Sequence, residues 1–193
     1  GDVYKRQLIY GGSFNPPTIA HVIMAKYLMN EFEPKELLVV PTYDPPHKKD
    51  GGINVYEKFD MVKETFEEIP GVHVTDVEYK MKGISYTYKT VETLREKYDE
   101  LYLVMGMDSF LSFPKWVKPE RILELVNIIV LKRGGYEFKS NELYEKNKNK
   151  FIFLNNPLLE MSSTFVREQI HAEKDVRFFV TDKTYDYINE ILR

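Results

Sequence analysis

Along most of the chain, short apolar runs alternate with longer stretches whose apolar residues lie three and four positions apart. The short runs are typical of buried strands, and the longer stretches predict amphipathic helices. The predicted strands cover residues 8–10, 37–40, 72–77, 101–105, 128–131 and 151–154. The predicted helices cover residues 20–28, 55–69, 87–98, 120–125, 163–172 and 181–192. This alternation predicts an α/β fold, a doubly wound, Rossmann-like parallel sheet with helices on both faces.

No linker rich in Pro, Gly or Ser divides this pattern, so we expect residues 1–193 to form a single domain. The segment from residue 2 to residue 7, Asp-Val-Tyr-Lys-Arg-Gln, is polar for the start of a buried strand. It also matches an in-frame translation of a common sequencing-library adapter. We therefore expect residues 1–7 to be a non-native sequence.

The composition excludes several classes of function. With a net charge of -3, the chain lacks the strongly basic surface that is typical of DNA and RNA binders. The absence of cysteine excludes disulfides, thiolate catalysis and cysteine zinc sites. No apolar run approaches the roughly 20 residues that span a bilayer, and no signal-peptide pattern opens the sequence. We expect a cytoplasmic protein whose partners are neither nucleic acids nor membranes; whether it forms a homo-oligomer stays open.

Ligands of such sheets bind beyond the carboxyl ends of the strands, so the loops that follow the strands are the candidate site. The first of these loops contains Gly11 and Gly12, which let backbone N–H groups approach a ligand closely. Thr18 is placed to cap the following helix, and His21 lies one turn later. A helix N-terminus suits phosphate, and a histidine there can donate a hydrogen bond to a phosphoryl oxygen. The alternative is an ordinary turn with a partly buried histidine.

Two further loops carry polar groups at the same predicted edge. His47 and Lys48 follow the proline-stiffened end of the second strand, although a solvated loop is the simpler explanation. Ser85 and Thr87 precede the third long helix, where capping would account for both.

The later loops add nucleotide-binding candidates. Gly106 permits close approach at the end of a strand, and Asp108 can accept hydrogen bonds from ribose hydroxyls. Trp116, the only tryptophan, could stack on a flat ring or pack in the core. Hydroxyl groups at the start of a helix, with Arg167 one turn later, suit phosphate, but a plain capped helix is the alternative. Arg133 follows the fifth strand and adds positive charge.

In this order the motifs resemble those of the nucleotidyltransferase superfamily, and in particular the bacterial nicotinate-nucleotide adenylyltransferases. The first loop resembles the pattern G-x-F-[DN]-P-x-[HT]-x-G-H, with Thr18 at the [HT] position and Ala20 in place of the usual Gly. The segment from Met161 to Arg167 resembles I-S-S-T-x-[IV]-R, with Met161 in place of Ile. The strings P-P-H-K, S-Y-T, G-x-D and P-x-W narrow the resemblance to the nicotinate branch.

The resemblance implies which residues bind each substrate. The residues implied to bind ATP are Gly11, Gly12, Ser13, Phe14, Thr18, His21, Gly106, Asp108, Arg133, Ser162, Ser163, Thr164 and Arg167. Those implied to bind nicotinate mononucleotide are Asn15, His47, Lys48, Tyr86, Thr87 and Trp116. In the family, Lys48 would lie near the mononucleotide phosphate, and the S-Y-T backbone would bind the nicotinate carboxylate. We therefore expect the acid to be preferred over the amide.

The implied reaction is attack by the 5′-phosphate of the mononucleotide on the α-phosphorus of ATP, with loss of pyrophosphate. His21, Thr18 and Arg167 are the expected catalytic residues, and no covalent nucleophile is needed. Mg²⁺ is expected as a cofactor carried on ATP, with no metal ligands from the protein. Two alternatives remain. One is a related enzyme, such as a phosphopantetheine adenylyltransferase or a cytidylyltransferase, and the other is a non-catalytic nucleotide sensor, favoured only by Thr18 and Ala20.

Overall fold

The computed structural model describes residues 6–43, 53–83 and 86–192, and contains one parallel sheet of six strands. The strands are β1 (Arg6–Gly12), β2 (Glu36–Pro41), β3 (Val72–Val74), β4 (Glu100–Gly106), β5 (Asn127–Leu131) and β6 (Phe151–Phe153). Their order across the sheet is β3-β2-β1-β4-β5-β6, so the chain winds outward from β1 in both directions. This order confirms the predicted doubly wound, Rossmann-like architecture.

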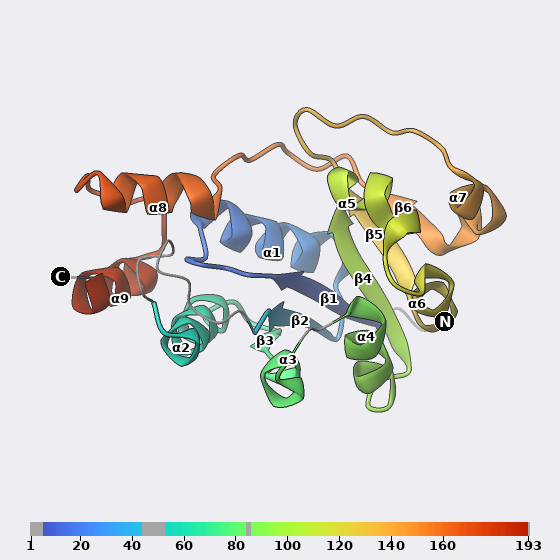
Figure 1. Cartoon of the computed structure of the whole chain (residues 1–193), viewed down its shortest axis with the longest axis horizontal. Coiled ribbons are helices and arrows are strands. Elements are labelled where there is room, and N and C mark those ends of the chain that lie inside the picture. The colour runs from blue at the N-terminus through green and yellow to red at the C-terminus, as the bar shows by residue number, and fades with distance from the viewer. Residues whose placement is uncertain (1–5, 44–52, 84–85, 193) are drawn as a thin grey trace.

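Helices connect the strands and cover both faces of the sheet (Figure 1). The α-helices are α1 (Ile19–Phe32), α2 (Val55–Phe66), α3 (Val77–Met81), α4 (Thr87–Arg95), α5 (Met107–Ser112), α6 (Pro119–Leu125), α7 (Glu142–Lys146), α8 (Ser163–His171) and α9 (Asp182–Leu192). The described residues also include the short 3-10 helices η3 (Phe113–Lys115) and η4 (Lys148–Lys150). None of the helices in the described part of the chain is long and apolar enough to cross a membrane.

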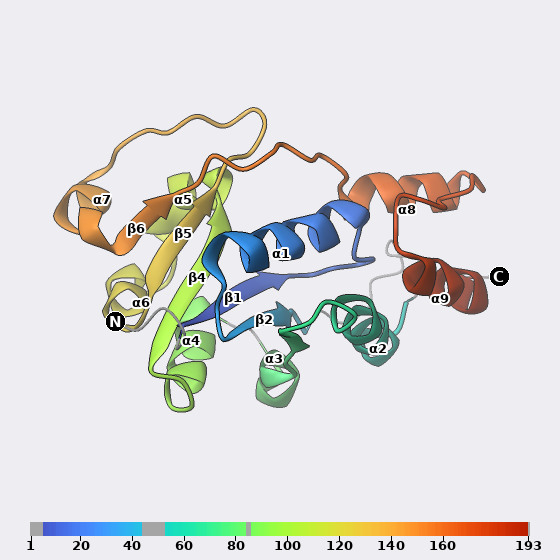
Figure 2. The same cartoon turned by 180° about the vertical axis from the view of Figure 1, so that it is seen from behind.

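The core consists of two apolar clusters, one on each face of the sheet. On one face, Leu28 of α1 and Phe66 of α2 pack against strand residues such as Leu8 and are fully buried. On the other face, Val91 of α4 and Ile122 of α6 pack in the same way. Figures 1 and 2 show α1 along one face and α4 along the other. Since strand residues are buried on both sides, their apolar runs are continuous rather than alternating.

A smaller apolar cluster joins α8 and α9 at one end of the molecule, where α9 also packs beside α2 (Figure 2). Val166, Val176, Val180 and Ile188 form this cluster. The chain therefore returns, after six strands, to the side of the sheet that holds the start of α1. The backbone N–H of Ile19 donates to the carbonyl of Phe179 at 2.8 Å and connects the two regions.

One predicted strand was partly wrong. Residues 72–77 were predicted to be extended, but β3 ends at Val74 and Val77 begins α3. The Thr75 hydroxyl accepts a hydrogen bond from the backbone N–H of Val77 at 3.3 Å, which turns the chain. The helix α3 then buries Val77 in the core and Tyr79 against Phe59 of α2. A five-residue helix contains too little periodicity to be recognised in the sequence.

Candidate active site

A cavity of about 930 Å³ lies at the carboxyl ends of the central strands. The strand ends that line it include Gly11 and Gly12 of β1, Val40 of β2, Gly106 of β4 and Leu131 of β5. This is the edge at which the sequence predicted a ligand site. The volume falls near the upper end of the range for small-molecule sites, roughly 300–1,000 Å³.

His21 lines this cavity from the first turn of α1. The backbone N–H of Thr18, the N-cap residue, donates to Nδ1 of His21 at 2.9 Å. Because Nδ1 accepts this hydrogen bond, the neutral ring carries its hydrogen on Nε2. Burial, together with the positive charge of Arg133, lowers the pKa of His21 from 6.5 to about 4. At neutral pH His21 is therefore an uncharged donor.

Thr18 lies away from the cavity, contrary to the simplest interpretation of its motif. Its side chain is fully buried, and its hydroxyl donates to the backbone carbonyl of Met161 at 2.7 Å. Thr18 therefore orients His21 through its backbone and holds the chain before α8 through its side chain. The sequence motif predicted a hydroxyl facing phosphate, and the cavity lining does not include it.

The start of α8 is fastened to the first loop by two further side chains. Ser163 donates from Oγ to the carbonyl of Pro16 at 2.7 Å, and Arg167 donates from Nη1 to the carbonyl of Asn15 at 2.7 Å. Arg167 also donates to the Thr164 hydroxyl at 3.2 Å. The two end motifs, about 150 positions apart, therefore form one unit, as the position of α8 beside the start of α1 shows (Figure 1).

The predicted ATP-binding residues divide into two groups around this unit. Those that line the cavity are Gly11, Gly12, Phe14, His21, Gly106, Asp108, Arg133, Ser162 and Ser163. Ser13, Thr18, Thr164 and Arg167 stand outside its lining. The N-cap residue Ser162 accepts a hydrogen bond from the backbone N–H of Phe165 at 3.0 Å. Its hydroxyl, expected to bind phosphate, thus also caps α8.

An ion pair crosses the cavity wall between the ends of β4 and β5. Nη1 of Arg133 lies 3.2 Å from Oδ2 and 3.3 Å from Oδ1 of Asp108. Gly106 lies beneath this pair, and a Cβ there would come within 2.6 Å of Asp108 Oδ1. Glycine at this position therefore allows the carboxylate to lie close to the strand end.

Only some of the residues expected to bind the mononucleotide line the cavity. Trp116 and Thr87 line the cavity, whereas Asn15 and Tyr86 do not. Tyr86 is exposed and stacks on Tyr88 instead, with ring centroids 6.2 Å apart. His47 and Lys48 lie outside the described residues, as does Ser85.

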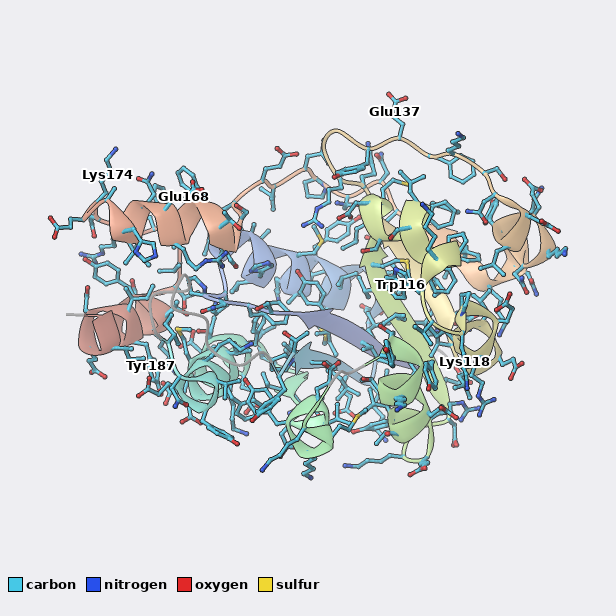
Figure 3. The ribbon with its side chains drawn as sticks, in the orientation of Figure 1. Trp116, Lys118, Glu137, Glu168, Lys174 and Tyr187 are labelled. Carbon is cyan, nitrogen blue, oxygen red and sulfur yellow. The ribbon has the colours of Figure 1, made fainter. Side chains whose placement is uncertain are left out.

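Trp116 is only partly buried, so core packing alone does not account for it. Its ring meets Phe113 edge-on at 5.2 Å, and its Nε1 donates to the Ser112 hydroxyl at 3.3 Å. In the view of Figure 3 the side chain lies between α5 and α4. One side of the indole is therefore held in place while another borders the cavity.

Among the cavity-lining residues that sequence reasoning did not predict are Tyr10, Glu78, Asn156 and Glu160. Asn156 is buried, and its Oδ1 accepts from the backbone N–H of Lys132 at 2.7 Å. Its Nδ2 donates to the Lys132 carbonyl at 3.3 Å and to the Pro157 carbonyl at 3.1 Å. Asn156 thereby fixes the backbone just before Arg133. No local pattern marks such a residue, because its role depends on a partner 24 positions away.

Comparisons with known proteins agree with this geometry. The chain matches the profile of the cytidylyltransferase-like family over residues 9–169. It is 34% identical over 187 residues to a Thermosipho melanesiensis protein named "Probable nicotinate-nucleotide adenylyltransferase", with 95% of this chain and 94% of the relative covered. It is 39% identical over 166 residues to an Aquifex aeolicus protein of the same name, with 82% of this chain and 99% of the relative covered.

Among solved structures, the fold is similar to that of Plasmodium falciparum nicotinic acid mononucleotide adenylyltransferase complexed with APC. The TM-score is 0.76 at 21% identity, with 97% of this chain and 96% of that chain covered. This likeness establishes the fold, and the sequence relatives establish the family. The chain belongs to the cytidylyltransferase-like family, in its nicotinate-nucleotide adenylyltransferase branch.

Proposed function

We propose that this chain transfers the adenylyl group of ATP to nicotinate mononucleotide, a step of NAD biosynthesis. An oxygen of the mononucleotide 5′-phosphate forms a bond to the α-phosphorus of ATP, and the bond from that phosphorus to the β-phosphate bridging oxygen breaks. The products are nicotinate adenine dinucleotide and pyrophosphate. The observation that carries the proposal is His21, an oriented N–H donor in the lining of a cavity of about 930 Å³.

Catalysis in this scheme consists of alignment and charge neutralisation rather than covalent chemistry. His21 donates from Nε2 to an oxygen of the α-phosphate as charge develops there. Arg133 supplies positive charge close enough to His21 to lower its pKa. Because His21 is uncharged in the free protein, it contributes a hydrogen bond in this scheme rather than a full positive charge.

In this scheme the start of α8 binds the β- and γ-phosphates of ATP. Ser162 and Ser163 border the cavity at this helix N-terminus, where unpaired N–H groups and the helix dipole favour an anion. Arg167 and Thr18 act mainly by holding the α8 region and the first loop together, and Thr164 accepts a hydrogen bond from Arg167. Exchange of the Asn15 carbonyl for a phosphate oxygen would bring the Arg167 guanidinium into direct contact with ATP.

Mg²⁺ is proposed to arrive on the triphosphate. The part of the chain that the structure describes contains no group of three His, Asp or Glu side chains arranged to hold a metal ion. Asp108, a carboxylate that lines the cavity just after β4, is paired with Arg133. Phosphate oxygens and water would therefore supply most of the ligands, and the metal would neutralise charge on ATP.

The mononucleotide end of the cavity is proposed to lie at Thr87 and Trp116. Trp116 offers an aromatic face to the pyridine ring, and α4 begins at Thr87, where the first backbone N–H groups have no partner within the helix. Such groups bind a carboxylate better than a carboxamide, because a charge-assisted hydrogen bond is about twice as strong as a neutral one. We therefore propose that the acid is preferred over the amide. His47 and Lys48 remain proposed ligands of the mononucleotide.

Pyrophosphate release from Mg·ATP tests the proposed function. Nicotinate mononucleotide, its amide analogue and phosphopantetheine are supplied in parallel at equal concentration. The proposal predicts the fastest release with nicotinate mononucleotide. Faster release with phosphopantetheine would assign a related adenylyltransferase instead, and ATP binding without release in any reaction would favour a nucleotide sensor.

A further inference from the structure

Tyr10 occupies a position in β1 that no motif marks, immediately before the glycine pair. Its ring is held edge-on by two phenylalanines, at centroid distances of 5.6 Å from Phe14 and 6.4 Å from Phe66. Phe14 and Phe66 are both buried, so the direction of the tyrosine ring is fixed by packing. These packing contacts need only the aromatic ring, since a phenylalanine could make the same contacts.

The Tyr10 hydroxyl is different, because packing does not account for it. Within the described residues, only Arg6 Nε and Asn15 Oδ1 are fully buried side-chain polar atoms without a hydrogen-bond partner. The Tyr10 hydroxyl is not one of them, and it takes part in none of the hydrogen bonds of the described residues. It therefore keeps some accessible surface, and the surface that Tyr10 borders is the cavity.

The surroundings of this hydroxyl suit an anion. The Phe14 ring that contacts Tyr10 also meets the His21 ring edge-on, at 5.1 Å between centroids. Tyr10 and His21 thus flank the same phenyl group. The positive charge of Arg133 acts on both side chains. Burial nevertheless raises the pKa of Tyr10 above its ordinary value, so the hydroxyl keeps its proton and can donate it.

We propose that the Tyr10 hydroxyl donates a hydrogen bond to the triphosphate of bound ATP, on the same side of the cavity as His21. The inference deepens the proposed function and rests on it for the identity of the substrate. It adds an ATP-binding residue from within β1, whereas the family motifs begin at strand ends and continue into loops and helix starts. Glycine at the next two positions leaves the backbone open, so that phosphate can approach the strand end closely.

Tyr10→Phe tests the proposal, because it deletes one oxygen and retains the ring that packs between Phe14 and Phe66. The matched control is Tyr27→Phe in α1. Tyr27 packs against the same apolar cluster and is not part of the cavity lining. Dissociation constants for Mg·ATP and for adenosine are measured by calorimetry on wild type and both variants, and the thermal midpoint is recorded for each.

The expected result is that Tyr10→Phe weakens Mg·ATP binding by roughly tenfold, a typical loss for a hydrogen bond to a charged group. Adenosine, which has no phosphate, should bind all three proteins equally, and Tyr27→Phe should bind Mg·ATP as wild type does. Equal Mg·ATP affinity for Tyr10→Phe and wild type would overturn the proposal. Equal losses for adenosine and Mg·ATP would also overturn it, since they would indicate a packing role.

A failure of the proposed function can be distinguished from a failure of the proposed role of Tyr10. If wild type binds Mg·ATP but releases no pyrophosphate with nicotinate mononucleotide, the adenylyl-transfer reaction is wrong while the binding comparison still decides the role of Tyr10. If wild type does not bind Mg·ATP at all, both proposals are wrong.

Discussion

The ionisation of His21 offers a quantitative test of the site, because its protonation is opposed by two features of the fold. The surrounding protein removes the ring from water, and Arg133 places a like charge near the imidazolium. Together they lower the pKa of His21 from 6.5 to about 4. Protonating His21 should therefore cost about 3 kcal/mol more in the folded chain than in the unfolded chain.

The sign follows from proton binding in the two states. Between pH 6.5 and pH 4 the unfolded chain has a protonated His21 and the folded chain does not. Acidification therefore favours the unfolded state through this residue. The stability contributed by neutral His21 is fully present above pH 6.5 and is lost progressively as the pH falls towards 4.

The assay combines NMR and denaturation. The ring resonances of His21, assigned by their absence from His21→Gln, are followed from pH 7.5 downwards, and urea unfolding is measured for both proteins at each pH. The wild type should lose up to about 3 kcal/mol relative to His21→Gln between the two ends of the titration. A His21 midpoint near 6.5, or parallel stability curves for the two proteins, would refute the neutral, buried donor.

Three further substitutions test other parts of the site. His21→Ala should lower turnover by roughly 10²–10⁴ with the thermal midpoint little changed, and turnover within a few-fold of wild type would exclude the proposed role. Trp116→Ala should raise the KM for nicotinate mononucleotide far more than the KM for ATP, whereas equal increases would indicate packing. Asn156→Ala should reduce the free energy of unfolding by roughly 1–3 kcal/mol, because it removes a buried side chain that bonds both Lys132 backbone groups. Unchanged urea unfolding would contradict that assignment.

The sheet could be predicted from the sequence because its signals are local. Residues 37–40 and 128–131 are continuous apolar runs, and they become central, doubly covered strands. Residues 20–28 repeat apolar positions with helical spacing and become part of α1. Short elements such as α3 and α5 were missed, since five or six residues do not display a period.

The position of the cavity could also be predicted, because parallel strands bring their carboxyl ends to one edge. The roles of the individual residues around the cavity could not be predicted. Whether the Thr18 hydroxyl faces phosphate or the Met161 carbonyl depends on how α8 packs, 143 positions later in the chain. The lowered pKa of His21 depends likewise on Arg133 and on burial, and neither is visible in a local motif.

The roles of Arg167 and Ser163 show the same limit. Their spacing predicted a phosphate cradle, and in the structure both side chains hold the first loop through its carbonyl groups. A motif at a helix start can serve either purpose, since the same donors satisfy a carbonyl or a phosphate oxygen. Only the folded arrangement distinguishes the two.

The fate of each ATP phosphate tests the central claim most directly. ATP labelled with radioactive phosphorus at the α-position is incubated with nicotinate mononucleotide and Mg²⁺. A parallel reaction contains γ-labelled ATP, and the products of each reaction are separated. We predict that the α-label enters a dinucleotide that contains the pyridine ring, and that the γ-label leaves as pyrophosphate. The γ-label in the pyridine product, or the α-label only in free AMP, would contradict adenylyl transfer in this cavity.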